Sequence, residues 1–341
     1  MDDLHTWRDL LGRIISNPQE RQRLAEATGV TPITLVRWST QKSTPRLDNL
    51  QPLLNGLTHS REKMRALLAE DYPELAQESQ EAEEIGTEVP STFYSQILNT
   101  STTSPPILRK VTISTLVLQQ ILGHLDPRQR GMAAIIMLCV PPHKGKKVHS
   151  IRTTYGRGNP PWESYLEHHI KFLGAESQAG HAVRAGHPII VQNRDEKNWF
   201  YPTHAVDFEE SIITLPLLLG DQTAGCLYVA STEKNYFNQA RIEVLQTYVD
   251  LLIVAFEEED FYRFEQIELE LMPTYEVQQS FLAQFRQHVA QHMIQSAQQG
   301  KSLTRQEAEL QVWQEIEEKL LYIALNPQEE ADKKAQQSND Y

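Results

Sequence analysis

The stretch "SIITLPLLLGDQTAGCLYVAS" occupies residues 211–231 and decides the fold of the larger part of the chain. Two runs of strand-forming residues flank "GDQTAG", whose Gly and Asp suit a hairpin connection. Pro216 has no N–H to give to a central ladder, so it marks a sheet edge or a bulge. The stretch therefore predicts an antiparallel hairpin inside a larger sheet.

The sequence on either side of this hairpin completes an α+β pattern. Upstream, "GMAAIIMLCV" (131–140) has the length of a strand. The segment "GAESQAGHAVRAGHPIIVQN" (174–193) predicts a helix that ends near Gly186 and is followed by a strand. Downstream, residues 235–258 place their apolar side chains on one helix face. A mixed domain with a mainly antiparallel sheet follows from these patterns.

This arrangement resembles a GAF domain over residues 105–262. The resemblance rests on the strand at 131–140, on Ala-x-x-x-Gly-x-Pro-Ile-Ile-Val at 182–191, on the hairpin, and on a helix after Phe237. It implies an antiparallel sheet with helices on one face and a small-molecule pocket on the other side. Members that bind cyclic nucleotides carry Asp-Glu where this chain has Arg241-Ile242, which argues against that ligand.

The contents of the predicted pocket stay open, with the effector and any cofactor unknown. Aromatic residues gather in the segment "NWFYPTHAVDFEES" (198–211), where they form either a pocket lid or a cap on the core. The candidate pocket residues are Tyr155, Arg184, Trp199, Phe200, Tyr201 and Thr214. Five His between residues 168 and 204 match no metal-ligand spacing, so they are interpreted as surface or hydrogen-bonded side chains.

The N-terminal part contains a second informative stretch, "RQRLAEATGVTPITLVRWSTQKSTPRLDNL" (21–50). Asn17 and Thr31 are typical N-caps, and each precedes a Pro at the first helical position. Gly29 suits the end of the first helix. In the second helix Leu35 and Trp38 face inward, because residues three apart share a face. Two short helices joined by a tight Gly turn form a helix-turn-helix unit.

This stretch resembles the Cro/phage-repressor (XRE-type) helix-turn-helix over roughly residues 4–70. The resemblance implies that the second helix enters the major groove of double-stranded DNA, with Arg37 reading guanine and Ile33 touching a thymine methyl. Ser39-Thr40-Gln41 departs from the Glu-x-Gly that is frequent in the family. The candidate DNA-binding residues are Arg21, Thr31, Pro32, Ile33, Thr34, Arg37, Gln41, Lys42 and Arg46.

The remaining segments are predicted as connections and helices. Residues 76–104 are acidic, then rich in Ser and Thr, which is typical of a flexible linker between a domain at 1–75 and the GAF-like domain. From about residue 240 the pattern is helical almost throughout. Apolar stripes in 263–341 predict a helical hairpin, which packs within the chain or joins two chains as a homodimer.

Composition limits the class of protein. The net charge is −13, yet residues 1–70 carry ten Lys and Arg against eight Asp and Glu, so the N-terminal part is weakly positive. Cys139 and Cys226 are too few for a disulfide framework, and no apolar run is long enough to cross a membrane. These features predict a cytoplasmic protein. No catalytic motif or metal signature is present, so an enzyme is not expected.

These observations predict a multidomain α and α+β chain: an all-α helix-turn-helix, a central GAF-like sheet and a C-terminal helical hairpin. The favoured function is a transcription regulator whose GAF-like domain senses a small molecule and alters DNA binding through dimer geometry. The alternative is an interaction scaffold, in which the N-terminal helices and the GAF-like domain both bind proteins. A third possibility is an enzyme whose active site has no recognisable motif.

Overall fold

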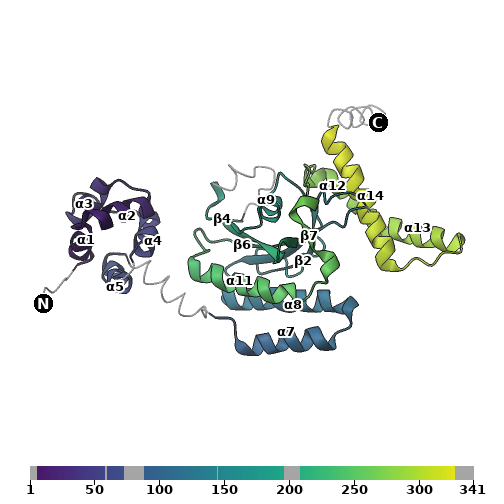
Figure 1. Cartoon of the computed structure of the whole chain (residues 1–341), viewed down its shortest axis with the longest axis horizontal. Coiled ribbons are helices and arrows are strands. Elements are labelled where there is room, and N and C mark those ends of the chain that lie inside the picture. Colours follow the sequence, from purple (N-terminus) through teal and green to yellow (C-terminus); the bar gives the residue numbers. More distant parts are fainter. Residues whose placement is uncertain (1–5, 58–59, 73–87, 144, 196–207, 327–341) are drawn as a thin grey trace. The chain divides into compact units, whose positions relative to one another are not determined.

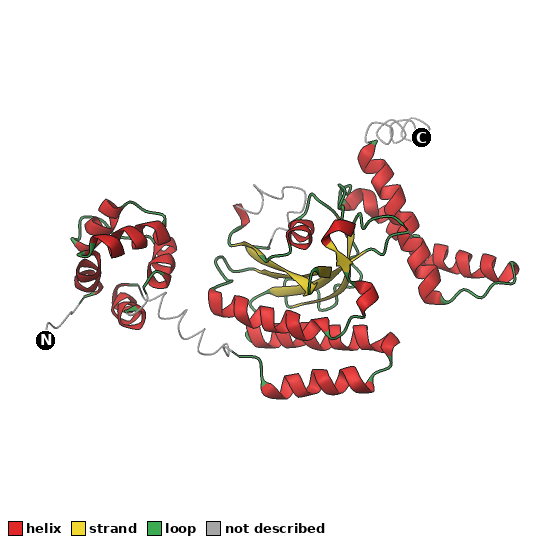
Figure 2. Cartoon of the chain, viewed as in Figure 1, coloured by secondary structure: helices red, strands yellow, loops and turns green. Residues whose placement is uncertain are grey.

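The computed structural model describes residues 6–57, 60–72, 88–143, 145–195 and 208–326. The chain divides into two compact units, Met1–Gly86 and Thr87–Tyr341. The described part of the first unit is helical, and the second contains an antiparallel sheet with helices (Figure 2). No helix in the described ranges is long and apolar enough to cross a membrane.

The first unit is built from short helices around one apolar core. Leu24, Leu35, Trp38 and Leu54 are buried in that core. The helices are α1 (Trp7–Ile15), α2 (Pro18–Thr28), α3 (Pro32–Ser39), α4 (Leu47–Asn55) and α5 (Arg61–Asp71).

The helix limits predicted around the Gly turn are confirmed. The Asn17 side chain accepts a hydrogen bond from the Gln19 N–H at 2.9 Å, which satisfies one of the free donors at the start of α2. Helix α2 ends at Gly29, which has a φ of 66°. Thr31 caps α3 in the same way as Asn17 caps α2, and Pro32 is its first residue.

The second unit is organised by a seven-stranded antiparallel sheet in the order β3-β2-β1-β6-β5-β4, with β7 pairing to β6. Its strands are β1 (Met132–Cys139), β2 (Ile151–Gly158), β3 (Phe172–Leu173), β4 (Ile189–Val191), β5 (Ser211–Leu219), β6 (Gln222–Ser231) and β7 (Tyr262–Arg263). The predicted hairpin is confirmed as β5–β6, which turns at Gly220-Asp221. Pro216 lies on β5 beyond the pairing with β4, which ends at Thr214, so it is at a sheet edge as expected.

Helices cover the two faces of this sheet differently. Helices α8 (Pro106–Leu125) and α11 (Gln239–Ile253) lie on one face, and α7 (Ser91–Thr103) packs against α8 (Figure 1). Helix α9 (Gln178–Ala185) lies on the other face, where it contacts β5 and β6. It ends at Gly186, as predicted from the sequence.

The prediction of a linker through residue 104 is wrong for Ser91–Thr103, which forms α7. This segment has few apolar residues, but two of them, Phe93 and Ile97, are buried. The Phe93 ring meets the edge of Tyr248 on α11, with 5.9 Å between ring centroids. Packing against other helices therefore stabilises a helix that its own sequence pattern favours only weakly. The first part of the expected linker, 76–87, lies outside the described residues.

The prediction of nearly continuous helix after residue 240 is also wrong between α11 and α12 (Tyr275–Leu282). The chain instead forms the 3-10 helix η2 (Glu258–Asp260), strand β7, and the 3-10 helix η3 (Phe264–Gln266). Ile267 then bridges to Val148 in parallel. This segment therefore pairs with the sheet through β7 and Ile267 and does not continue α11.

The C-terminal helices form the predicted hairpin, and its apolar faces are covered within the chain. Val312, Trp313 and Ile316 of α14 pack with Val289 of α13 and with Phe172 of β3 in one cluster. The helices are α12 (Tyr275–Leu282), α13 (Phe285–Gln298) and α14 (Arg305–Leu325). The intramolecular alternative therefore holds for these apolar faces.

Candidate functional site

A cavity of about 340 Å³ opens on the face of the sheet that carries α9. Its floor includes Ile135 and Met137 of β1, Thr153 of β2 and Tyr228 of β6. The segment 161–171, the first residues of α9, residues 208–209 and the start of α12 form its walls. The volume is at the lower end of the range for small-molecule sites in proteins.

Gly156 lets the wall of the cavity approach the sheet closely. A Cβ at this position would lie 2.7 Å from the Cβ of Leu166, a separation that real side chains do not reach. The Leu166 N–H donates to the Gly156 carbonyl at 3.1 Å. The missing side chain in β2 therefore allows segment 161–171 to fold back over the strand and to enclose the cavity.

A β-bulge selects which side chains of β2 face the cavity. Tyr155 pairs with Ile136 and Thr153 pairs with Met137, so Thr154 is the extra residue. In a regular strand residues 153 and 155 would share a face, but the extra residue places them on opposite faces. Thr153 lines the cavity and Tyr155 does not, so the prediction of Tyr155 as a pocket anchor is wrong.

The other predicted pocket residues that the structure describes are Arg184 and Thr214. Arg184 is exposed on the outer side of α9, whose buried side is made by neighbours such as Ala182 and Val183. Thr214 is fully buried on β5, opposite Ile189 and Tyr228. Neither side chain lines the cavity. The prediction of Arg184 as a pocket anchor is wrong, whereas Thr214 is the cross-strand neighbour of the cavity residue Tyr228 and its role stays a prediction. The predicted pocket residues Trp199, Phe200 and Tyr201 lie outside the described residues.

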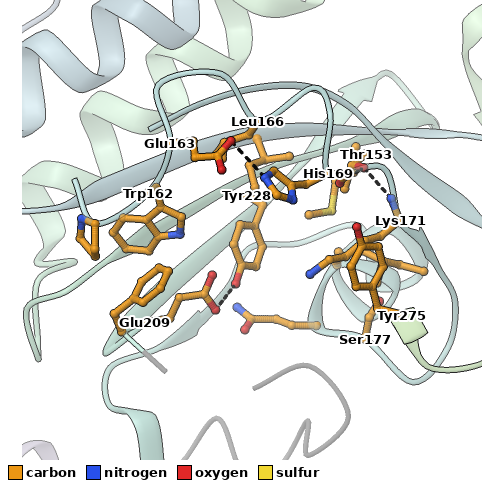
Figure 3. A pocket seen from close by; sticks show the side chains of 17 residues that line it. Thr153, Trp162, Glu163, Leu166, His169, Lys171, Ser177, Glu209, Tyr228 and Tyr275 are labelled. Atoms are coloured by element: carbon orange, nitrogen blue, oxygen red, sulfur yellow. Dashed lines mark hydrogen bonds and ion pairs between the residues drawn. The ribbon is translucent and has the colours of Figure 1, made fainter. Parts of the chain in front are cut away.

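Aromatic rings and one carboxylate form one side of the cavity. Trp162 and Phe208 meet edge to face with 4.8 Å between ring centroids. The Tyr228 hydroxyl donates to Oε2 of the buried Glu209 at 3.0 Å. Burial and the neighbouring Glu209 carboxylate raise the pKa of Tyr228 well above its ordinary value, so its phenol stays protonated. Figure 3 shows Trp162, Glu209 and Tyr228 around one end of the open space.

Polar and cationic groups form the opposite side. The Lys171 ammonium lies over the Tyr275 ring at 4.9 Å from its centroid, and Ser177 caps the start of α9 nearby (Figure 3). Thr153 joins two parts of the wall, because its hydroxyl donates to the His169 carbonyl at 3.0 Å and accepts from the Lys171 N–H at 2.8 Å. This side of the cavity is suited to an anionic group.

His169 lines the cavity, and it is exposed and hydrogen-bonded as the sequence analysis expected. Its Nε2 lies 3.3 Å from a carboxylate oxygen of Glu163, and both side chains are exposed near the opening. No group of three His, Cys, Asp or Glu in the described ranges could hold a metal ion. The loop that carries Trp162, Glu163, His169 and Lys171 was missed by the sequence reasoning, although aromatic and ionisable residues cluster there after a Gly-containing strand.

The candidate DNA-binding residues lie on one short segment of the first unit. Ile33 is 66% exposed, and Arg37 on the same helix is exposed, while Leu35 and Trp38 are buried. Pro32, Thr34 and Arg21 are half-buried. The other candidates are exposed: Thr31, Gln41, Lys42 and Arg46. Their roles toward DNA stay predictions.

The family model described as GAF domain matches residues 112–257. These residues form a GAF domain, a curled antiparallel sheet with helices. The match does not extend into the first unit, for which the helix-turn-helix assignment is not confirmed. The sequence has no match among curated proteins.

Several solved structures are similar to part of this chain. A putative GAF sensor protein from Burkholderia vietnamiensis is 18% identical, with 51% of this chain and 93% of that chain covered and a TM-score of 0.33. The GAF-B domain of DevS from Mycobacterium smegmatis is 19% identical, with coverages of 43% and 91% and a TM-score of 0.31. A type II free methionine-R-sulfoxide reductase from Thermoplasma acidophilum is 15% identical, with coverages of 43% and 94% and a TM-score of 0.32.

Proposed function

We propose that the chain is a DNA-binding transcription regulator whose GAF domain senses a small molecule. The GAF domain by itself suggests a sensor role. The observation that carries the DNA-binding part is the exposed face of α3, where Ile33 and Arg37 project beside a basic turn while Leu35 and Trp38 hold the helix in the core.

The charge around α3 supports binding to a polyanion. Residues 27–47 contain Arg37, Lys42 and Arg46 but no Asp or Glu, although the whole chain has a net charge of −13. All three basic side chains are exposed. Phosphate contacts position such a unit on DNA, and an Arg that reaches a guanine edge adds sequence preference.

Contacts from α1 fix the end of α3, as expected for a helix that recognises DNA from a rigid backbone. Arg8 of α1 donates from Nη1 to the Trp38 carbonyl at 2.8 Å, and its guanidinium lies 4.3 Å from the centroid of the Trp7 ring. The Trp38 carbonyl therefore accepts from Arg8 as well as from the Gln41 N–H at the end of α3. The exposed side chains of α3 are therefore presented from a fixed backbone.

In the proposed mechanism, ligand in the GAF cavity shifts the population of two states that differ in DNA affinity. Such a shift requires that the ligand prefer one state. We further propose that two copies act together, because a single helix-turn-helix binds DNA weakly and a two-fold site doubles the contacts. Light scattering after gel filtration measures this directly, and a monomer at every concentration that binds DNA contradicts it.

The DNA-binding proposal is tested with the full chain and a pool of random duplexes, by selection and then by fluorescence anisotropy. Wild-type protein is expected to bind with an affinity that falls steeply with salt, because phosphate contacts release counterions. Arg37→Ala is expected to weaken binding to the selected duplex by about 1–3 kcal/mol. Arg23→Ala is the matched control, because Arg23 is an exposed α2 residue that pairs with Glu20 at 2.6 Å.

The same experiment separates the regulator from the interaction scaffold. A scaffold would leave no enriched duplex at low salt, and Arg37→Ala and Arg23→Ala would behave alike. Capture of a protein partner whose binding is insensitive to salt and is lost in Ile33→Ala would favour the scaffold. We propose no enzymatic activity for either role.

A further inference from the structure

The aromatic end of the GAF cavity has the composition of a site for a positively charged nitrogen. Trp162, Phe208 and Tyr228 line it together with the carboxylate of Glu209. Glu209 is only 5% exposed, and its Oε2 accepts the Tyr228 hydroxyl. Ring faces attract cations through their quadrupole, and a carboxyl oxygen accepts hydrogen bonds from N–H donors.

A second, independent observation comes from Gln178 at the start of α9. Gln178 lines the cavity and is 5% exposed. Its Nε2 donates to the Ile189 carbonyl at 3.1 Å, which fixes the orientation of the amide, and its Oε1 has no hydrogen-bond partner. A buried acceptor without a partner is costly, so a ligand that brings an N–H donor to Oε1 would recover that cost.

We propose that the cavity binds a small molecule that carries an ammonium group, with its nitrogen held by the rings of Trp162, Phe208 and Tyr228 and by Glu209. The N–H groups of the ligand are also the donors for Gln178. The inference rests on the proposed sensor function and names the chemical class of the effector.

The opposite end of the cavity allows the same ligand to carry a carboxylate. Lys171 lies across the open space from Glu209 in Figure 3, beside the start of α9. The N–H groups in the first turn of a helix lack intrahelical acceptors, and the helix dipole is positive there. A small zwitterion with its ammonium toward Glu209 and its carboxylate toward Lys171 matches both ends. The aliphatic floor of Ile135 and Met137 suits an apolar body between them.

The test uses the full chain and three probes of similar shape: 2-phenylethylamine, phenylalanine and 3-phenylpropanoate. Binding is measured by calorimetry and by the rise in the melting temperature. The two probes that carry ammonium are expected to bind and to stabilise the second unit, and 3-phenylpropanoate is expected to bind at least about tenfold more weakly. Preference for 3-phenylpropanoate overturns the proposal, as does the absence of binding by both amines.

Variants locate the ammonium group. Glu209→Gln keeps an acceptor for the Tyr228 hydroxyl, and it is expected to weaken 2-phenylethylamine binding by about tenfold or more. Trp162→Leu, in the half-buried wall, is a second variant that spares the sheet, with an expected loss of about twofold to thirtyfold. Glu210→Gln is the matched control, because Glu210 does not line the cavity and its carboxylate lies 3.8 Å from Lys234. Amine affinity that is unchanged in both Glu209→Gln and Trp162→Leu overturns the proposal.

Failure of this inference can be told apart from failure of the proposed function. If 3-phenylpropanoate alone binds and Lys171→Met abolishes that binding, the cavity is still a sensor site but selects anions. If native mass spectrometry finds no small molecule on the purified chain and none of the three probes binds, the sensor function fails as well. DNA binding by the first unit is measured separately and depends on neither result.

Discussion

At the scale of single residues, the most perturbed acid of the C-terminal helices is Glu317 on α14. It is buried and accepts a short hydrogen bond from the Ser150 hydroxyl. Burial raises the pKa of the Glu317 carboxyl to about 7, although the bond from Ser150 and the nearby Lys146 oppose that rise. The carboxyl is therefore largely protonated in the folded protein at mildly acidic pH.

This raised pKa predicts a loss of stability with rising pH. The pKa of Glu317 in the folded protein exceeds its ordinary value of 4.5. Protonation of Glu317 therefore contributes its full stabilisation below pH 4.5, and this stabilisation is lost as the pH rises through about 7. The free energy of unfolding is expected to fall by about 3 kcal/mol in total over this pH range. Denaturant unfolding of the second unit at about pH 5 and about pH 8 measures it. Glu317→Gln is expected to flatten the dependence, whereas Glu309→Gln, which pairs with Arg305 on the surface of the same helix, is expected to keep it. A slope that survives in Glu317→Gln contradicts the assignment.

Gln41 and Gly29 end neighbouring helices in the same way, which gives a second prediction at this scale. The Val30 N–H donates to the Ala25 carbonyl and the Lys42 N–H to the Arg37 carbonyl, so both ends are Schellman motifs. The residue in the left-handed region is Gly29 (φ 66°) in one and Gln41 (φ 61°) in the other. A side chain there costs about 1 kcal/mol. Gln41→Gly is therefore expected to stabilise the first unit, and Gly29→Ala to destabilise it, by about that amount. Amide hydrogen exchange in α2 and α3 of the full chain measures both, and equal signs would contradict the argument.

At the scale of elements, one stack of side chains joins α13, α14 and the edge of the sheet. Trp313 of α14 stacks on Phe285 of α13 with 3.7 Å between ring centroids. Trp313 also contacts two residues of the sheet. The Arg152 guanidinium of β2 lies 4.1 Å from the centroid of the Trp313 ring, and Phe172 of β3 packs against the same ring. The hairpin and the edge of the sheet therefore share one core.

Removing this ring is expected to loosen the hairpin. Trp313→Ala should cost about 3–5 kcal/mol, because it leaves a cavity among buried rings and removes the cation–π contact. Hydrogen exchange and limited proteolysis across 285–325 are the measurements. Tyr322→Ala is the control on the same helix, since the Tyr322 side chain is 53% exposed. Equal protection of the hairpin in Trp313→Ala and Tyr322→Ala would show that the stack contributes little.

At the scale of the whole molecule, the proposed regulator requires free-energy coupling between the GAF cavity and DNA. If a cavity ligand changes DNA affinity by some factor, DNA must change ligand affinity by the same factor. A coupling of about 1–3 kcal/mol is expected for such a regulator. Titrating 2-phenylethylamine into the chain with and without the selected duplex measures one side of the cycle, and anisotropy with and without the amine measures the other. If the amine and the duplex both bind tightly but neither changes the affinity for the other, the chain has two binding sites without coupling, which contradicts the proposed regulator.

Features that depend only on neighbouring residues could be predicted from the amino-acid order. The caps at Asn17 and Thr31, the end of α9 at Gly186 and the β5–β6 hairpin are all where the sequence places them. Each of these is fixed by hydrogen bonds or backbone dihedrals within a few residues, so a short stretch contains the whole cause.

The cavity and the helix in place of the expected linker could not be predicted, because both depend on long-range packing. The extra residue Thr154 in β2 turns Tyr155 away from the cavity and leaves Thr153 in it. This bulge is visible only in the pairing of β1 with β2, which the sequence alone does not give. The cavity walls come from segments far apart in the chain, Trp162, Gln178 and Tyr275 among them. Helix α7 is stabilised because Phe93 packs against the ring of Tyr248, which lies more than a hundred residues further along the chain. Such contacts depend on how elements pack in space, and the local order of side chains does not contain that information.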